Sequence, residues 1–155
     1  MKMKKILEKD IKKVCAVCKK NYVTSDLDLN PCPFCGWYND PFCEENPDNV
    51  IYRNLISFNK AKQLYSEGKP FEPNLDEFIE ALFFYSEMQF EYKGTYFAVE
   101  LVGKNKDELN IQLYNSKTKE SQIFKTKDDF KNNAKIDGKL LKDIWDDTTD
   151  RYWLQ

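Results

Sequence analysis

The sequence predicts an α+β protein that begins with a small cysteine-rich unit. Three patterns indicate this fold class: two Cys-x-x-Cys pairs, then apolar residues at helical spacing, then a switch to a period of two from Met88 onward. In chain order they predict a four-cysteine zinc ribbon, two helices, a four-stranded antiparallel meander and short C-terminal helices. We expect the ribbon, with a basic arm and an acidic loop, to occupy residues 1–56 and an α+β domain to occupy residues 57–155.

The two cysteine pairs are Cys15 with Cys18 and Cys32 with Cys35, and thirteen residues separate them. Four thiolates are the complete ligand set of one tetrahedral Zn²⁺ ion. The segment between the pairs is slightly shorter than usual for this pattern, which predicts one compact β-hairpin there. A disulfide pair or free core cysteines are the alternatives, although free core cysteines rarely fall into two such pairs. We predict one structural Zn²⁺ ion bound by these four residues.

The residues on either side of the cysteine pairs have weaker signals. Residues 1–13 are basic with loosely helical apolar spacing, which predicts a solvated arm or a fraying helix; an arm that contacts phosphates is the alternative. Trp37 and Tyr38 are expected to pack over the metal site. Cys43 is expected to be a small buried residue, ahead of an alternate ligand or a nucleophile, because acidic neighbours disfavour its thiolate.

Two helices are predicted after the acidic loop. Ser57 can cap the first, over about residues 58–67, which ends at a glycine. Asn74 can cap the second, over about residues 75–86, and Glu77 completes a capping box. The apolar residues of the second helix form one stripe, so we expect it to pack inside the domain.

The antiparallel sheet is predicted over about residues 88–125. A turn at Lys93–Gly94 joins its first two strands, and two polar turns separate the others. The alternation gives the sheet one apolar face, which another layer must cover. A short helix after Thr126 and an apolar stripe in residues 140–145 are expected to contribute to this layer, and the tail that follows is acidic.

Residues 32–68 resemble the small bacterial cysteine-rich CPCC-type proteins, which carry a CPxC-aromatic-Trp-acidic segment and a helix ending in Tyr-x-x-x-Gly. The matching positions are Cys32, Pro33, Cys35, Trp37, Asp40, Ser57, Asn59, Ala61, Tyr65 and Gly68. The chain departs from the pattern with CAVC at the first pair, with Gly36 at the aromatic position before Trp37, with two residues instead of three between Tyr65 and Gly68, and with Lys62 where the family tends to have arginine. Residues 88–155 look like a strand-rich unit of small Firmicute proteins of unknown function. The resemblance implies a zinc ribbon but no established activity.

The composition narrows the classes of function. The chain has no histidine, which excludes Ser-His-Asp and Cys-His catalysis and every histidine-ligated metal site. The net charge of −2 argues against a general nucleic-acid coat, although residues 1–20 hold eight lysines against two acids. Cysteines at metal-binding spacing are typical of a reducing compartment. The sequence shows no signal-peptide core and no apolar run long enough to span a membrane. We therefore predict a cytoplasmic protein without a membrane partner.

These observations leave three classes of function. The leading one is a non-enzymatic zinc-ribbon protein that binds another protein. One form of it is an inhibitor of the immunity, phage or anti-defence type, whose carboxylates would mimic phosphates. The acidic clusters behind that form are Asp40, Glu44, Glu45 and Asp48, and Asp143, Asp146, Asp147 and Asp150. The alternative is nucleic-acid binding through the basic N-terminal arm.

An enzyme is the third class. It would use carboxylate pairs such as Glu77 with Glu80 or Glu87 with Glu91, which sit at ordinary helix or strand spacing. We therefore assign no catalytic residue and no cofactor-binding residue. The sequence predicts neither the partner nor the oligomeric state.

Overall fold

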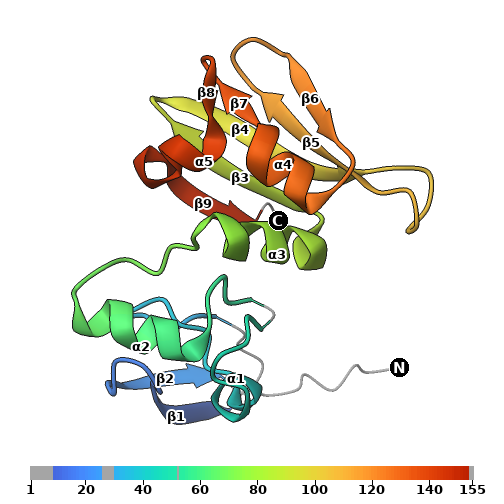
Figure 1. The fold of residues 1–155 in the computed structure, drawn as a ribbon. Helices are drawn as coiled ribbons and strands as arrows, with labels where there is room; N and C mark the ends of the chain where they lie inside the picture. Colours follow the sequence, from blue (N-terminus) through green and yellow to red (C-terminus); the bar gives the residue numbers. More distant parts are fainter. Residues whose placement is uncertain (1–8, 26–29, 52, 154–155) are drawn as a thin grey trace, which may run out of the picture. The chain divides into compact units, whose positions relative to one another are not determined.

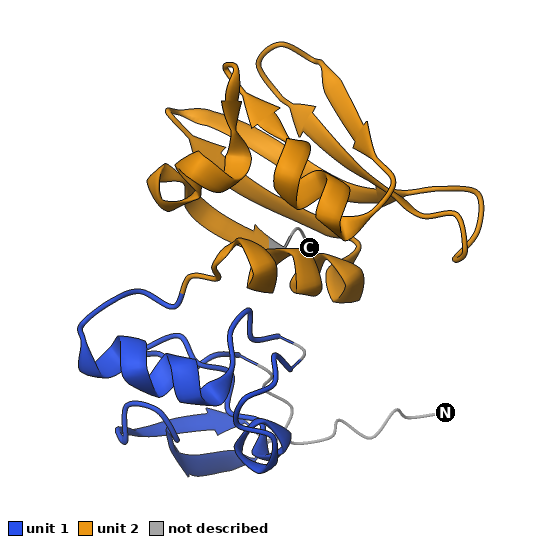
Figure 2. Cartoon of the chain, viewed as in Figure 1, with its two compact units in different colours: residues 1–71 blue, residues 72–155 orange. Residues whose placement is uncertain are grey.

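The computed structural model describes residues 9–25, 30–51 and 53–153, and the chain divides into two compact units, unit 1 (residues 1–71) and unit 2 (residues 72–155) (Figure 2). The elements of unit 1 are β1 (Asp10–Val14), β2 (Asn21–Ser25), α1 (Pro41–Glu45) and α2 (Phe58–Ser66). Unit 2 contains α3 (Leu75–Tyr85), a five-stranded sheet and several short elements (Figure 1). Residues 1–8 of the predicted basic arm lie outside the described residues.

The segment before the first cysteine pair is a strand, which corrects the prediction of an arm or a fraying helix. β1 pairs antiparallel with β2, with Lys12 opposite Val23. The β1–β2 hairpin therefore has the first cysteine pair in its turn. The sequence predicts the hairpin between the two cysteine pairs, and only β2 lies in that segment. Thr24 on one face is buried, whereas Val14 and Val23 on the other face are exposed. Five residues are too few for periodicity to separate a strand from the start of a helix.

Helix α2 belongs to unit 1, so the boundary between the units lies after residue 71 and not after residue 56. Ser57 caps the helix as predicted, because its hydroxyl accepts a hydrogen bond from a backbone N–H of the first turn (3.2 Å). Phe58 and Ala61 are the buried residues of the helix, and both lie in the core that holds the cysteines. The ring of Phe58 packs 5.9 Å from that of Trp37. This contact joins α2 to the cysteine-rich segment.

Unit 2 is built on a five-stranded antiparallel sheet in the order β6-β5-β4-β3-β9 (Figure 1). Its strands are β3 (Glu87–Tyr92), β4 (Thr95–Val102), β5 (Asn110–Asn115), β6 (Ser121–Phe124) and β9 (Thr149–Trp153). The first four form the predicted meander, and the α+β class is confirmed. The fifth corrects the prediction, because the acidic tail forms an edge strand beside β3. From Gln89 to Glu91, β3 advances two residues while its partner β9 covers three, from Tyr152 to Thr149, which is a β-bulge. Asp150 in this bulge has φ 51°. The extra residue interrupts the alternation of apolar and polar residues by which a strand is recognised in a sequence.

The helices of unit 2 pack against one face of this sheet. The buried strand residues on that face are Met88, Phe90, Tyr92, Phe97, Val99, Ile111, Leu113 and Phe124. The elements between β6 and β9 are α4 (Lys127–Asn133), β7 (Lys135–Ile136), β8 (Lys139–Leu140), α5 (Leu141–Ile144) and the 3₁₀ turn η1 (Trp145–Asp147). The ring of Trp145 lies edge-on to Phe78 of α3 (5.0 Å) and to Phe90 of β3 (5.4 Å). The core therefore unites helix, sheet and C-terminal segment.

The N-terminus of α3 carries the predicted capping box. The Asn74 side chain accepts a hydrogen bond from the backbone N–H of Glu77 (2.8 Å), and the Glu77 carboxylate accepts one from the N–H of Asn74 (3.0 Å). These two bonds satisfy donors that the first turn of a helix leaves free. The start of α3 is thus fixed beside Pro73, where unit 2 begins.

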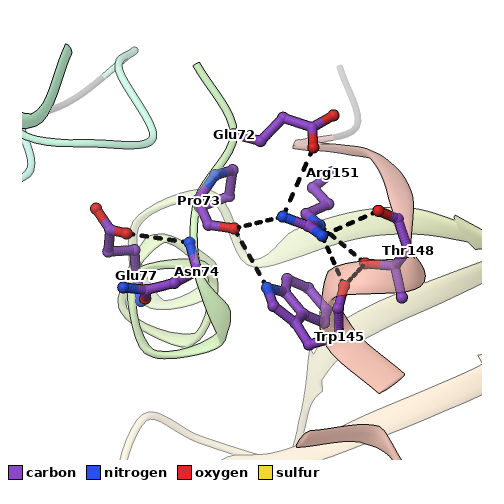
Figure 3. Close-up of polar contacts among 7 residues, drawn as sticks. All are labelled: Glu72, Pro73, Asn74, Glu77, Trp145, Thr148 and Arg151. Carbon is purple, nitrogen blue, oxygen red and sulfur yellow. Dashed lines mark hydrogen bonds and ion pairs between the residues drawn. The ribbon is translucent and has the colours of Figure 1, made fainter. Parts of the chain in front are cut away.

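Arg151 of β9 joins the two ends of unit 2 (Figure 3). Its guanidinium donates to the carbonyl oxygens of Pro73 (3.1 Å), Trp145 (2.6 Å) and Thr148 (2.9 Å), and to the Thr148 hydroxyl (2.8 Å). The Glu72 carboxylate lies 3.6 Å away, and the Arg151 side chain is only 8% exposed. Burial lowers the pKa of Arg151 and the charge of Glu72 opposes that shift. One side chain therefore ties the last strand to the first residues of unit 2.

We predict that Arg151→Met destabilises unit 2 by about 2–4 kcal/mol, because it removes the charged donor that binds the carbonyls of Pro73, Trp145 and Thr148 together with the Thr148 hydroxyl. Hydrogen exchange read by mass spectrometry should show faster exchange in β3 and β9 and unchanged protection in unit 1. Lys117→Met removes one positive charge at an exposed turn and should change neither. Unaltered exchange in β9 of the Arg151 variant would contradict the role of this side chain.

Candidate metal centre

The two cysteine pairs lie in two turns of the same design. In each turn the N–H of the first cysteine donates to the carbonyl five residues later, and its own carbonyl accepts from the N–H four residues later; the four distances lie between 2.8 and 3.0 Å. The residue that follows each pair has a left-handed backbone, with φ 60° at Lys19 and 83° at Gly36. Both turns therefore present their two sulfur atoms on the same side.

The turns bring all four predicted ligands into one cluster. The Sγ atoms of Cys15, Cys18, Cys32 and Cys35 lie within 4.8 Å of one another. Two close pairs take one cysteine from each turn: the sulfurs of Cys15 and Cys35 are 3.6 Å apart, and those of Cys18 and Cys32 are 3.7 Å apart. A tetrahedral site with zinc–sulfur bonds of about 2.3 Å places its sulfurs about 3.8 Å apart. The donor type and spacing thus fit one thiolate-bound metal ion.

The environment of the sulfurs favours one thiolate and disfavours others. Burial raises the pKa of Cys15, but backbone N–H groups of its own turn and the Asn39 side chain stabilise the thiolate and set the pKa at about 7. Burial also raises the pKa of Cys35 and of Cys18, and the neighbouring Cys15 sulfur raises that of Cys35 further. Four sulfurs this close cannot all ionise unless a cation compensates their charge.

Two asparagine side chains that the sequence analysis missed hold the loops around the cluster. Asn39 accepts a hydrogen bond from the N–H of Ala16 in the first turn (2.9 Å) and donates to the Tyr22 hydroxyl of β2 (3.0 Å). Asn54 is buried; its side chain accepts from the N–H of Tyr38 (3.1 Å) and donates to the carbonyl of Tyr38 (3.0 Å). Neither residue falls in a recognisable spacing, so only the three-dimensional contacts reveal these roles.

Trp37 packs in the core of unit 1, as predicted, in the same cluster of buried residues as the cysteines. It is 1% exposed, and its ring lies edge-on to Phe71 at 6.3 Å. Within the described residues, its indole nitrogen is the buried side-chain polar atom that has no hydrogen-bond partner. Its contribution to unit 1 is therefore apolar packing.

Cys43 is buried in α1 and stands apart from the four-sulfur cluster, so the prediction of a small buried residue is confirmed. Its sulfur accepts a hydrogen bond from the side-chain amide of Asn54 (3.6 Å). Burial raises the pKa of the Cys43 thiol, and the charges of Asp40 and Glu44 add to this effect. The thiol therefore stays protonated and is a poor nucleophile.

Several predicted acidic residues have local structural roles. Asp40 caps α1 by accepting from the N–H of Phe42 (2.9 Å), and Asp48 accepts from the Asn59 side chain (2.7 Å). Glu80 pairs with Lys127 (2.9 Å). The second predicted acidic cluster remains exposed at Asp143, Asp146, Asp147 and Asp150. Among the described residues, the four cysteines alone form a group of three or more potential ligands close enough to share an ion.

A scan of protein-family models finds no match to this chain, and searches of curated proteins and of solved structures find none. The resemblance to the CPCC-type proteins therefore stays a prediction. Over the residues that the structure describes, every helix is too short or too polar to span a membrane.

We predict that Gly36→Ala destabilises unit 1 by about 1 kcal/mol, the usual cost of a left-handed backbone for a residue with a Cβ atom. An added Cβ would have no atom within 4 Å, so backbone conformation is the source of the cost. Urea unfolding of unit 1, followed by hydrogen exchange, measures it. Phe34→Ala changes an exposed side chain in the same turn and should have a smaller effect; equal effects would contradict the argument.

Proposed function

We propose that this chain is a zinc-stabilised binding protein, in which one structural Zn²⁺ ion bound to Cys15, Cys18, Cys32 and Cys35 makes unit 1 a scaffold for contact with another protein. The convergence of the four sulfur atoms within 4.8 Å of one another carries this proposal. Four thiolates fill the tetrahedral coordination of Zn²⁺ and leave no position for water or substrate. The ion therefore acts on structure and not on a reaction.

The donor set supports the choice of zinc. Soft thiolate ligands select Zn²⁺, Cu⁺ or iron over the hard cations Mg²⁺ and Ca²⁺. Two turns that each supply two thiolates to one centre match a structural Zn²⁺ site of the four-cysteine type. A mass measurement separates zinc from the other thiophilic metals.

The ion also accounts for how so small a unit folds. The ligands Cys15, Cys18 and Cys32 are themselves part of the core of unit 1, together with Trp37 and Phe58. Without an ion, burial opposes the deprotonation of Cys18 and Cys35, and the neighbouring Cys15 sulfur opposes that of Cys35 further. With an ion, ligand binding and core formation become a single event, so binding energy adds to folding energy.

We predict that the wild-type protein carries one zinc ion in native mass spectrometry and that Cys32→Ser weakens zinc binding by more than about 100-fold. In the variant, hydrogen exchange should accelerate through the two turns while unit 2 keeps its protection. Cys43→Ser is the matched control, because it replaces a buried thiol outside the cluster and should retain the ion. A wild-type protein that purifies without metal and gains none from added Zn²⁺ would overturn the proposal.

The protein partner is tested by affinity capture from the source cell after nuclease treatment. A partner that is retained by wild-type protein and Cys43→Ser but lost by Cys32→Ser supports a zinc-dependent contact through unit 1. Retention by all three proteins would show that unit 1 is not the contact surface.

Nucleic-acid binding by unit 1 is the second candidate, and one aromatic residue favours it. Phe34, at the tip of the second turn, is 56% exposed, and the ammonium group of Lys20 lies 5.1 Å from its ring centroid. An exposed ring with adjacent positive charge can stack on a base while lysine contacts phosphate. Fluorescence anisotropy with a labelled single-stranded oligonucleotide tests it: binding should weaken steeply with salt and by roughly tenfold in Phe34→Ala. No binding at low salt would reject this candidate.

A further inference from the structure

The five-stranded sheet of unit 2 has one face packed against helices and one face that no described element of unit 2 covers. The strand residues that alternate with the buried ones point to this second face, and all of them are partly or fully exposed. We call its part on β9, β3 and β4 the open face: Glu87, Gln89, Glu91, Tyr96, Ala98, Glu100, Val102, Thr149 and Tyr152. Tyr96 and Tyr152 are 45% and 43% exposed. Two phenol rings thus lie on an accessible surface.

The register of the sheet places like charges opposite each other on the open face. Glu87 of β3 is the direct partner of Glu100 of β4. The neighbouring pair exchanges a backbone hydrogen bond, from the N–H of Leu101 to the carbonyl of Ser86 (2.9 Å), so Glu87 and Glu100 form a non-hydrogen-bonded pair. Side chains approach most closely in such pairs, and like charges there destabilise the sheet. Thr or Lys at either position would be more favourable for folding alone.

The negative charge continues from this pair across the open face. Glu91 lies opposite Tyr96 on the same two strands. The charge of Glu91, its hydrogen bond to the phenol and the charge of Asp150 on β9 raise the pKa of Tyr96. No strand position of the open face is a lysine or arginine. The carboxylates therefore have no cationic neighbour within the face.

We propose that the open face binds a segment of a partner protein rich in arginine or lysine. Such a segment would offset the repulsion between Glu87 and Glu100 and would pair with Glu91. The exposed rings of Tyr96 and Tyr152 offer faces on which a guanidinium can stack. The proposal deepens the proposed function, because it names a surface and the charge of its partner, and it rests on that function only in taking the partner to be a protein.

The negative charge of the open face favours a basic protein segment over nucleic acid or a second copy of this chain. Nucleic acid is repelled by a surface that carries carboxylates without cations. A second copy of this chain, paired through the same face, would bring its own carboxylates against these. A basic protein segment is the occupant that lowers the electrostatic energy of the face.

Fluorescence anisotropy of a fluorescein-labelled peptide of alternating arginine and serine, titrated with the full-length zinc-loaded protein at low salt, tests the proposal. The double variant E87Q/E100Q should weaken binding by roughly two- to thirtyfold, the range for two exposed ion pairs. The control D107N/E108N removes the same charge from the exposed loop between β4 and β5 and should change binding less than twofold. Amide chemical shifts perturbed by the peptide should map to β3, β4 and β9.

The thermal midpoint of unit 2 supplies a readout that distinguishes binding from folding. E87Q/E100Q should unfold at a higher temperature than wild type, since the like-charge pair is gone, although it binds the peptide more weakly. Equal weakening by both double variants, absence of wild-type binding, shifts that map elsewhere, or a dimer formed through this face in sedimentation would each overturn the proposal. Metal content is measured separately on the same samples, so failure of the zinc proposal and failure of this one give different results.

Discussion

Four sulfur atoms within 4.8 Å of one another are the feature on which our account of unit 1 rests, because the proposed ion would couple their binding to its folding. As thiolates they repel one another, and as buried thiols they offer the core only weak hydrogen-bond donors. A single divalent ion removes both difficulties. The matched turns, the amide contacts of Asn39 and the packing of Trp37 all serve to hold the sulfurs in this arrangement. In the proposed function, metal binding by the cluster and the stability of unit 1 are therefore coupled.

The parts of the structure that sequence reasoning predicted are those in which the signal is local. Two residues between cysteines suffice to define a turn that directs both sulfurs, so the ligand set follows from spacing. Helix starts were found at Ser57 and Asn74, because a cap is a contact between residues three positions apart. The first four strands of the sheet follow from alternation and from the Lys93–Gly94 turn.

The parts that sequence reasoning missed depend on contacts distant in the chain. β1 is recognisable only through its pairing with β2 across the first turn, and β9 only through its pairing with β3. The left-handed residue Asp150 shifts the register of β9 and removes its period of two. The assignment of α2 to unit 1 depends on the burial of Phe58 against Trp37, which no helix pattern contains. Asn54 is a further example, because nothing in the sequence around a loop asparagine indicates which backbone groups its side chain will bind.

The position of Arg151 has a consequence for synthesis on the ribosome. Unit 1 has its own core and its complete ligand set once residue 71 has emerged, so it can fold while translation continues. Unit 2 cannot do the same: until β9 has been made, β3 has an unpaired edge, and the carbonyl of Pro73 has the Trp145 indole N–H as a donor but not Arg151. The nascent chain thus carries a finished first unit ahead of a second whose sheet is closed by its last strand.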